Sequence, residues 1–263
     1  AALAGPSEGA RAAGTGGSRW YAGLIYGPGP IRPTELKQVD EDIYTLEQPL
    51  LFVNVTANIR STVVRMADGG LLVYNPVGAT EECVRLIDSL GGEVKYILLP
   101  TTVVEHKIFM RRFVNKFPKA KVYVAPGQFS WPVDLGLGFR VDGTLDDGKV
   151  FPWSDEFDHA TYLFKNPAFG FSSEAVLLHK KSKTLLVTDA VVYVDDDVPD
   201  LKSALQVLFL SPPTMPLELV YRKLFVVPAV ERFVFRRDLA LTRRWVDKIA
   251  AWDFNSLIAA HFS

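Results

Sequence analysis

The chain has 263 residues and a nearly balanced charge, with 29 lysines and arginines against 30 aspartates and glutamates. This length suits one large domain or two small ones, and the balanced charge gives no bulk electrostatic case for binding nucleic acid or an anionic membrane. A single cysteine excludes a disulfide framework and any multi-cysteine zinc or iron–sulfur site within the chain. Four histidines are a small supply for a metalloenzyme, and no segment is both long and apolar enough to predict a transmembrane helix.

The first 36 residues are predicted to form an extended arm ahead of the folded domain. Residues 1–18 are mostly Ala, Gly and Ser, which cannot nucleate a core, and a Gly- and Pro-rich stretch with Trp20 and Tyr21 follows. Such an arm either binds a partner protein or folds back on its own domain, and both interpretations stay open. We predict one domain over residues 37–263.

The first half of this domain is predicted to combine antiparallel strands with strand–helix–strand units. Thr80 can cap a helix whose first turn is acidic, and Cys83 falls on the inward face of that helix, where we expect a core residue. The predicted elements are a strand at 42–46, a hairpin of strands 59–66 and 71–75, a helix from Thr80 to Leu90, a strand at 94–99, a helix with Val104, Ile108, Phe113 and Phe117 on its apolar face, and a strand at 121–125.

The second half returns to antiparallel strands and closes with a helix. We expect a hairpin of strands 173–179 and 184–188, a helix over 238–251 with Trp245 facing inward, and a last strand at 256–260. Together the two halves predict an α/β fold with mixed sheets, compatible with a four-layer αββα sandwich.

Two carboxylates and two histidines stand at predicted strand ends. Glu105 and His106 lie where a strand runs into a helix, Asp189 ends another strand, and His261 follows the last one. Side chains at the ends of neighbouring strands converge, so these four could form a metal site. Each also has a structural interpretation: Glu105 suits the positive end of a helix, while the other three can form ordinary hydrogen bonds, brace a loop or lie on the surface.

Several segments resemble the metallo-β-lactamase-fold hydrolases, and they occur in the same order. They are Leu71 to Pro76, the Glu105-His106 segment, Thr184 to Ala190, and Ile258 to His261. Four further segments resemble an uncharacterised branch of that superfamily, a domain of unknown function found in plants, algae and cyanobacteria: Tyr74 to Thr80, Pro100 to His106, Phe117 to Gln128 and Leu185 to Val191. The resemblance covers Lys37 to His261 and implies the αββα sandwich.

The resemblance also implies that one half of the superfamily's two-metal centre is missing. In the motif His-x-His-x-Asp-His, the first two histidines correspond here to Thr101 and Val103. The middle histidine falls near Gly170, in a segment without histidine. None of these positions can supply an imidazole nitrogen.

The other half keeps a set of possible ligands. Glu105 and His106 correspond to the Asp-His of the motif, Asp189 to the bridging aspartate and His261 to the last histidine. This oxygen-rich set, vestigial or functional, would suit one Zn, Mn or Fe ion. One ion could still acidify a water molecule, but the clamp on both attacking and leaving oxygens would be gone.

Two further segments are candidates for binding a partner. Residues 202–235 are apolar and interrupted by prolines, with Phe209, Leu210 and Phe225 among them, and form either core, a lid or an interaction surface. A basic stripe of Arg236, Arg237, Arg243 and Arg244 on the closing helix is either a solvated face or a contact for an acidic partner or lipid headgroups, which leaves peripheral membrane association open.

Two functions are compatible with these observations. The first is a catalytically degenerate protein, a pseudoenzyme, that serves as a structural, assembly or interaction subunit of a protein complex. The second is a mononuclear metal-dependent hydrolase. We favour the first, because one half of the metal centre is missing and two segments suit a protein partner. The resemblance implies a plastid, in particular chloroplast, location and a partner such as a complex of photosynthesis.

Overall fold

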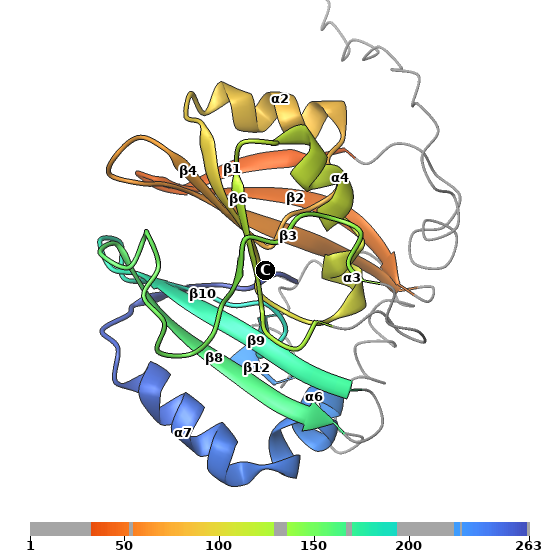
Figure 1. The fold of residues 1–263 in the computed structure, drawn as a ribbon, viewed down its shortest axis with the longest axis vertical. Coiled ribbons are helices and arrows are strands. Elements are labelled where there is room, and N and C mark those ends of the chain that lie inside the picture. Colours follow the sequence, from red (N-terminus) through yellow and green to blue (C-terminus); the bar gives the residue numbers. More distant parts are fainter. Residues whose placement is uncertain are drawn as a thin grey trace, which may run out of the picture.

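Two β-sheets pack face to face, and helices cover the outer face of each, in a computed structural model of the protein (Figure 1). The structure describes residues 33–52, 55–128, 136–166, 170–193, 224–226 and 228–261. This arrangement is the predicted αββα sandwich of mixed sheets. None of the helices in the described residues is long and apolar enough to cross a membrane.

The first sheet has seven strands that follow one another in chain order from β1 to β7. Strands β1 to β4 are antiparallel, and β4 to β7 are parallel, because a helical connection returns the chain to the same end of the sheet after β4 and again after β5. The strands are β1 (Glu35–Asp40), β2 (Ile43–Phe52), β3 (Val55–Arg65), β4 (Leu71–Tyr74), β5 (Val94–Leu99), β6 (Lys121–Val124) and β7 (Gly143–Thr144).

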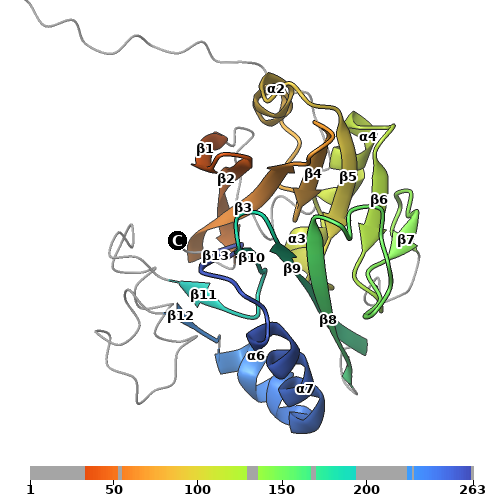
Figure 2. The ribbon, with the colours of Figure 1, turned by 90° about the vertical axis from the view of Figure 1, so that its left-hand side faces the viewer.

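The second sheet has four strands in the order β13-β10-β9-β8. Strands β8, β9 and β10 are antiparallel neighbours, and the last strand, β13, pairs parallel with β10. A separate pair, β11 with β12, lies beside this sheet (Figure 2). The strands are β8 (Phe157–Asn166), β9 (Gly170–His179), β10 (Thr184–Leu186), β11 (Val192–Tyr193), β12 (Leu224–Phe225) and β13 (Ser256–Ile258).

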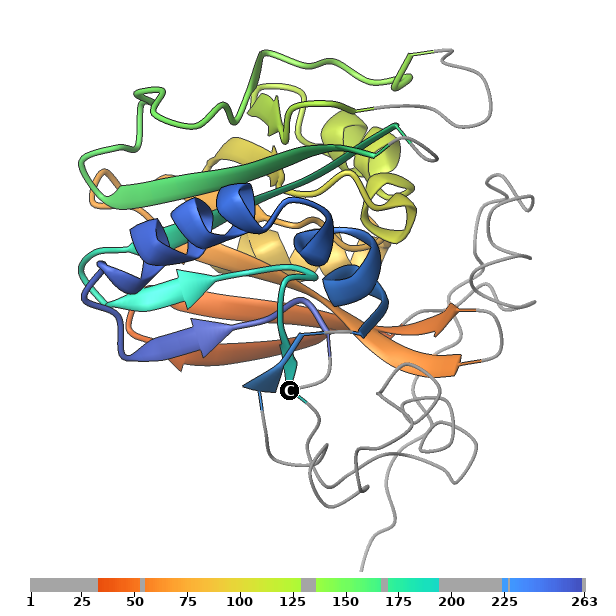
Figure 3. The ribbon, with the colours of Figure 1, turned by 90° about the horizontal axis from the view of Figure 1, so that it is seen from below.

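Side-chain caps set where the two longest described helices begin. The Thr80 hydroxyl accepts a hydrogen bond from the backbone N–H of Cys83 at 3.1 Å, and the Asp238 carboxylate accepts one from Leu241 at 2.8 Å. Helices α2 and α4 cover the first sheet, and α6 and α7 the second (Figures 1 and 3). The helices are α2 (Glu81–Ser89), α3 (Val104–Lys107), α4 (Met110–Lys116), α6 (Pro228–Phe233), the 3₁₀ turn η2 (Phe235–Arg237) and α7 (Leu239–Ala250).

Apolar side chains form one core between the sheets and one under each helical layer. Cys83 lies in the core under α2 and is fully buried, and its burial raises the pKa of the thiol to about 12. The prediction that Cys83 is a core residue is therefore confirmed.

Most predicted elements are present, but the helix after Pro100 differs from the prediction. It is divided into α3 and α4, and Val104, predicted on its apolar face, is 48% exposed. The other three predicted residues do face the core: Phe113 is fully buried, and Ile108 and Phe117 pack against the same cluster. Val104 was misplaced because a polar side chain, His106, lies on the buried face of its short helix.

Two further differences concern strands. Strand β1 begins at Glu35, inside the predicted arm, and β8 has no counterpart among the predicted elements. The rest of the arm, with Trp20 and Tyr21, lies outside the described residues, as do Phe209 and Leu210.

Candidate metal site

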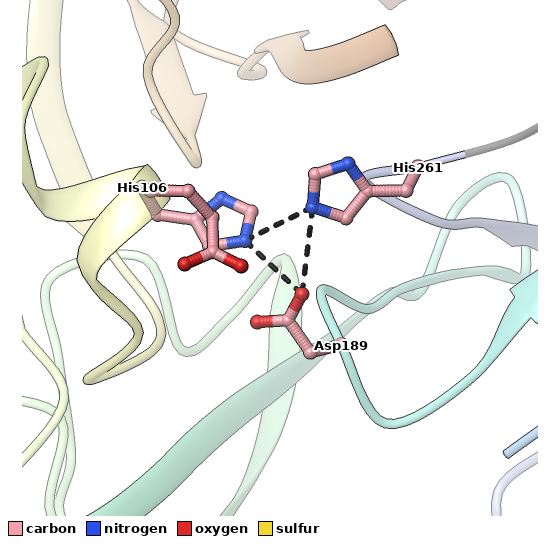
Figure 4. Close-up of side chains that lie close together, drawn as sticks. His106, Asp189 and His261 are labelled. Atoms are coloured by element: carbon pink, nitrogen blue, oxygen red, sulfur yellow. Dashed lines mark hydrogen bonds and ion pairs between the residues drawn. The ribbon is translucent and has the colours of Figure 1, made fainter. Parts of the chain in front are cut away.

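Four polar side chains from three distant parts of the sequence meet at the strand ends, as predicted. Glu105, His106, Asp189 and His261 each offer one ligand atom, and these atoms all lie within 4.8 Å of one another. Figure 4 shows both imidazole rings directed at one oxygen of the Asp189 carboxylate. The convergence expected from the sequence is present.

The topology of the two sheets explains why these residues meet. Four residues separate the end of β5 from the start of helix α3, which carries Glu105 and His106. Asp189 follows β10 and His261 follows β13, and these two strands are parallel neighbours, so both side chains leave the second sheet at the same end. The site therefore joins the end of a first-sheet strand to the ends of two second-sheet strands.

Three of the four ligand atoms form a tight triangle. Nε2 of His106 lies 3.1 Å from Oδ1 of Asp189, Nε2 of His261 lies 3.5 Å from the same oxygen, and the two Nε2 atoms are 3.2 Å apart. His106 is fully buried and His261 almost so. In a metal-free molecule, a proton on Nε2 of His106 can be donated to the Asp189 carboxylate or to Nε2 of His261, because both groups can accept a hydrogen bond.

The same triangle has the dimensions of a transition-metal site. The three donor atoms are 3.1, 3.2 and 3.5 Å apart, a spacing compatible with their binding one ion at the length of about 2.0–2.1 Å that zinc makes with nitrogen and oxygen ligands. Glu105 adds a fourth oxygen ligand within reach. The donor set of two imidazoles and two carboxylates therefore fits one Zn, Mn or Fe ion.

The backbone of β3 orients His261. Nδ1 of His261 lies 2.7 Å from the carbonyl oxygen of Asn58, and because a carbonyl can only accept, Nδ1 must carry the proton. In the neutral ring, Nε2 then has a free electron pair directed at the triangle. A hydrogen bond of this kind on the far nitrogen is typical of metal-binding histidines.

Arg60 holds the segment before His261 against β3. Its side chain is 5% exposed, donates to the Ala259 carbonyl at 2.8 Å and pairs with the Glu47 carboxylate at 2.8 Å. Its backbone N–H donates to the Ala260 carbonyl, also at 2.8 Å. These bonds fix the backbone from which His261 extends.

Glu174 on β9 braces the loop that carries Asp189, and the sequence analysis did not assign it a role in the site. One carboxylate oxygen accepts from the backbone N–H of Thr188 at 2.8 Å and the other from that of Asp189 at 3.2 Å. Glu174 is almost fully buried. The signal in the sequence was a single carboxylate inside the apolar run of residues 173–179.

The surroundings shift the pKa values of the titratable groups in the site in different directions. Burial alone would raise the pKa of the Asp189 carboxyl, but the adjacent imidazoles of His106 and His261 hold it well below its usual range. Burial, together with the charge of Asp189, raises the pKa of Glu105 and raises that of Glu174 to about 8. Burial would lower the pKa of His261, but its hydrogen bond with Asp189 outweighs this and raises it. Asp189 therefore stays charged at neutral pH.

The family of this chain follows from its sequence. A family model described as a domain of unknown function, DUF4336, matches residues 40–212 and 216–263. The chain belongs to this family. No curated protein matches the sequence of this chain.

Solved structures share the fold of this DUF4336 chain at low identity. The metal-soaked Flv1 flavodiiron core from Synechocystis sp. PCC6803 is 10% identical with a TM-score of 0.54, and the match covers 88% of this chain and 57% of that one. A metallo-β-lactamase from Pontibacter korlensis is 12% identical with a TM-score of 0.55, over 88% and 92%. A metallo-β-lactamase from Erythrobacter litoralis is 8% identical with a TM-score of 0.51, over 87% and 85%.

These matches show the metallo-β-lactamase fold and nothing finer. The DUF4336 chain spans just over half the length of the Flv1 core, so that protein's activity cannot be carried over as a finding. The fold resemblance found in the sequence is confirmed.

The positions predicted to have lost their ligands take up other roles in the DUF4336 structure. The Thr101 hydroxyl lies 3.4 Å from Oδ2 of Asp189 and accepts from the backbone N–H of Val103 at 3.2 Å. Val103 precedes helix α3, and Gly170 begins β9. The second oxygen of Asp189 therefore has a hydroxyl as its neighbour.

The remaining two histidines, His159 and His179, lie outside the cluster. Nε2 of His159 lies 3.0 Å from the Asp146 carbonyl, and Nδ1 of His179 lies 2.8 Å from the Ser182 hydroxyl. Phe225, predicted on an interaction surface, pairs with Val192 in the small β11–β12 ladder and is half-buried. Its proposed partner contact stays a prediction.

Proposed function

We propose that this DUF4336 protein binds one transition-metal ion through Glu105, His106, Asp189 and His261, and that it has lost hydrolytic function and acts as an interaction or assembly subunit. The ligand triangle carries the metal proposal, because three donor atoms already stand at the spacing that a bound ion requires.

The loss of hydrolysis is supported by the missing half of the centre. Thr101 and Val103 supply no imidazole, so a second ion has no nitrogen ligands there. If Glu105 were a fourth ligand, protein groups would fill all four coordination positions of an ion. No position would then remain for a water molecule, as in structural zinc sites. Two open clefts in the described residues are lined by none of the four site residues.

Metal analysis of the purified protein tests the binding proposal. We expect about one Zn, Mn or Fe per chain, and a loss of affinity of about a hundredfold to a thousandfold in His106→Ala, since a binding free energy of about 10–16 kcal/mol is shared by four ligands. His159→Ala is the matched control, because it removes an imidazole outside the cluster. Metal-free wild-type protein that does not take up added Zn, Mn or Fe would refute the proposal.

A mononuclear hydrolase is the second candidate, and one observation favours it. The two imidazoles and Asp189 could supply three ligands without Glu105. A metal site with three protein ligands keeps a position for water. A bound ion would then supply an acidified water, and Glu105 would lie close enough to take its proton.

Glu105→Gln separates the two candidates. If Glu105 is a ligand, this variant loses much of its metal affinity and wild-type protein hydrolyses none of a panel of β-lactam, thioester and phosphodiester substrates. If Glu105 is a base, the variant keeps its metal and loses a measurable wild-type hydrolysis.

The proposal also names a partner and a location. We place the protein in the plastid, bound to a multi-subunit complex of photosynthesis, on the family resemblance in the sequence. Co-migration with a large complex on native gels, lost on deletion of residues 1–33, would support a partner contact through the arm. A protein that migrates only as a free monomer would count against it.

A further inference from the structure

The outer surface of α6, η2 and α7 combines positive charge with exposed apolar side chains. These elements cover the second sheet on the side that faces away from the first (Figure 3). None of the four site residues belongs to them. We name the surface the arginine face and define it by Arg232, Arg236, Arg237, Arg243 and Arg244, with Leu239 and Val246.

Positive charge is concentrated on this surface. Residues 228–250 contain six basic and three acidic side chains, whereas the whole chain has a net charge of −1. The remainder of the chain is therefore acidic, and the charge is segregated rather than mixed.

Only part of this positive charge is neutralised locally. Arg236 forms an ion pair with Glu231 at 2.6 Å, and Arg243 lies 3.8 Å from Asp247 in a loose, exposed pair. Within the described part of the chain, Arg237 and Arg244 form no ion pair with a carboxylate. Both are exposed. Two guanidinium groups thus remain available to an external anion.

Apolar side chains stand among these arginines. Leu239 is 67% exposed and Val246 47% exposed. With Arg243 between them, they occupy positions i, i+4 and i+7 of α7, so they lie along one side of the helix. The exposure of these apolar side chains to water is unfavourable. An interface that is both anionic and apolar would bury them and would also pair with the arginines.

The helix presents this face in a fixed orientation. On the inner side of α7, the Trp245 ring is buried against Tyr162 and Phe235, and its indole N–H donates to the Ala160 carbonyl at 3.2 Å. The arginines therefore project from a helix that is already docked, and binding requires little ordering of the backbone.

We propose that the arginine face binds an anionic lipid surface and holds the protein at a membrane without spanning it. Arginine forks match the phosphates of lipid headgroups, and side chains such as Leu239 and Val246 can enter the boundary between headgroups and acyl chains. An acidic protein would satisfy the arginines as well, but its charged surface would leave the exposed leucine and valine without an apolar partner.

Vesicle sedimentation with the full 263-residue chain tests the proposal. We expect binding to phosphatidylcholine vesicles that contain about one third phosphatidylglycerol, weak binding to pure phosphatidylcholine, and release by salt. The double variant Arg237→Gln/Arg244→Gln should weaken binding by about 25-fold, since each basic residue near the surface contributes about fivefold. Leu239→Asn should weaken it further with no change in charge.

The matched control removes the same charge from the opposite helical layer. Arg85 and Arg112 are exposed on α2 and α4, and Arg85→Gln/Arg112→Gln should retain at least a third of the wild-type affinity. Thermal melting of every variant separates a loss of binding from a loss of folding, because exposed arginines contribute little to stability. Equal weakening by both double variants, or wild-type protein that binds polyglutamate but not the anionic vesicles, would overturn the proposal.

Discussion

The two halves of the proposed metal centre differ in this chain. Around Glu105, His106, Asp189 and His261, the ligand atoms are buried, close together and supported by further hydrogen bonds. Around Thr101 and the start of β9, no imidazole remains and the threonine hydroxyl meets the carboxylate. The candidate site therefore differs from the other half in the groups behind its side chains as well as in the side chains themselves.

Replacement of Arg60, which supports the backbone before His261, should have the largest effect on stability. Arg60→Met leaves the Glu47 carboxylate without its buried partner and frees the Ala259 carbonyl, so we expect a loss of about 3–5 kcal/mol in the free energy of unfolding. Metal affinity should fall by about tenfold, because the segment before His261 loses its side-chain bond at Ala259 and keeps only the backbone bond between Arg60 and Ala260. Chemical denaturation and metal titration measure both effects, and Arg85→Met, on the exposed side of α2, should change neither.

The metal-free protein should become less stable as the pH rises from about 4.5 to 8. Glu174 binds its proton more tightly when folded, since its pKa is raised to about 8 from an ordinary value of 4.5. Its stabilising contribution is therefore fully present below the unfolded pKa and is lost as the pH rises through the folded one. The raised pKa of His261 acts in the same direction above its ordinary value of 6.5.

Denaturant titrations across this pH range measure the effect. Each group can contribute a slope of at most about 1.4 kcal/mol per pH unit. Glu174→Gln should flatten the profile between pH 4.5 and 8, and a variant profile as steep as the wild type would show that Glu174 is not the responsible group.

The same Glu174→Gln change should weaken metal binding by about 10- to 100-fold. An amide presents a donor to one of the two backbone N–H groups that now bond the carboxylate, so the loop that carries Asp189 loses an anchor. Glu93→Gln is a suitable comparison, since Glu93 is exposed and far from the loop in the sequence. Competition with a chelator gives the two dissociation constants, and equal values would remove Glu174 from the site.

Thr101→Val should have the smallest effect, and it tests the half of the proposed centre that has no imidazole. The substitution removes a long hydrogen bond to Asp189 and the acceptor for the Val103 N–H, so we expect about 1 kcal/mol less stability. Metal affinity should stay within about threefold of the wild type. A fall comparable to that of Glu174→Gln would mean that the hydroxyl still contributes to the site and that the two halves are not independent.

Much of the fold could be predicted because local patterns and tertiary packing agree. The cap at Thr80, the inward Trp245 and the hairpin that contains β9 and β10 are all present. The failure at α3 has a clear cause, since a buried polar residue reverses the expected pattern. His106 lies on the buried face of its helix, and Val104, which hydropathy places inside, is exposed.

The candidate ligands could also be predicted, because their positions at strand ends and the resemblance to a known motif pointed to the same four residues. The supports of the site could not. Arg60 lies 201 positions before His261, and nothing in the local sequence connects them. Glu174 is a lone carboxylate in an apolar strand, and its partners are backbone N–H groups, which leave no mark on the residue types.

The sequence by itself determined which ligands exist, since Thr101, Val103 and Gly170 cannot become imidazoles in any fold. Only the tertiary structure decided that the remaining four could work together. The parallel pairing of β10 with β13 brings Asp189 and His261 to one end of the sheet, and α3 brings His106 to them across the sandwich. Ligand identity is a property of single residues, whereas a metal site needs distances that depend on how the two sheets pack.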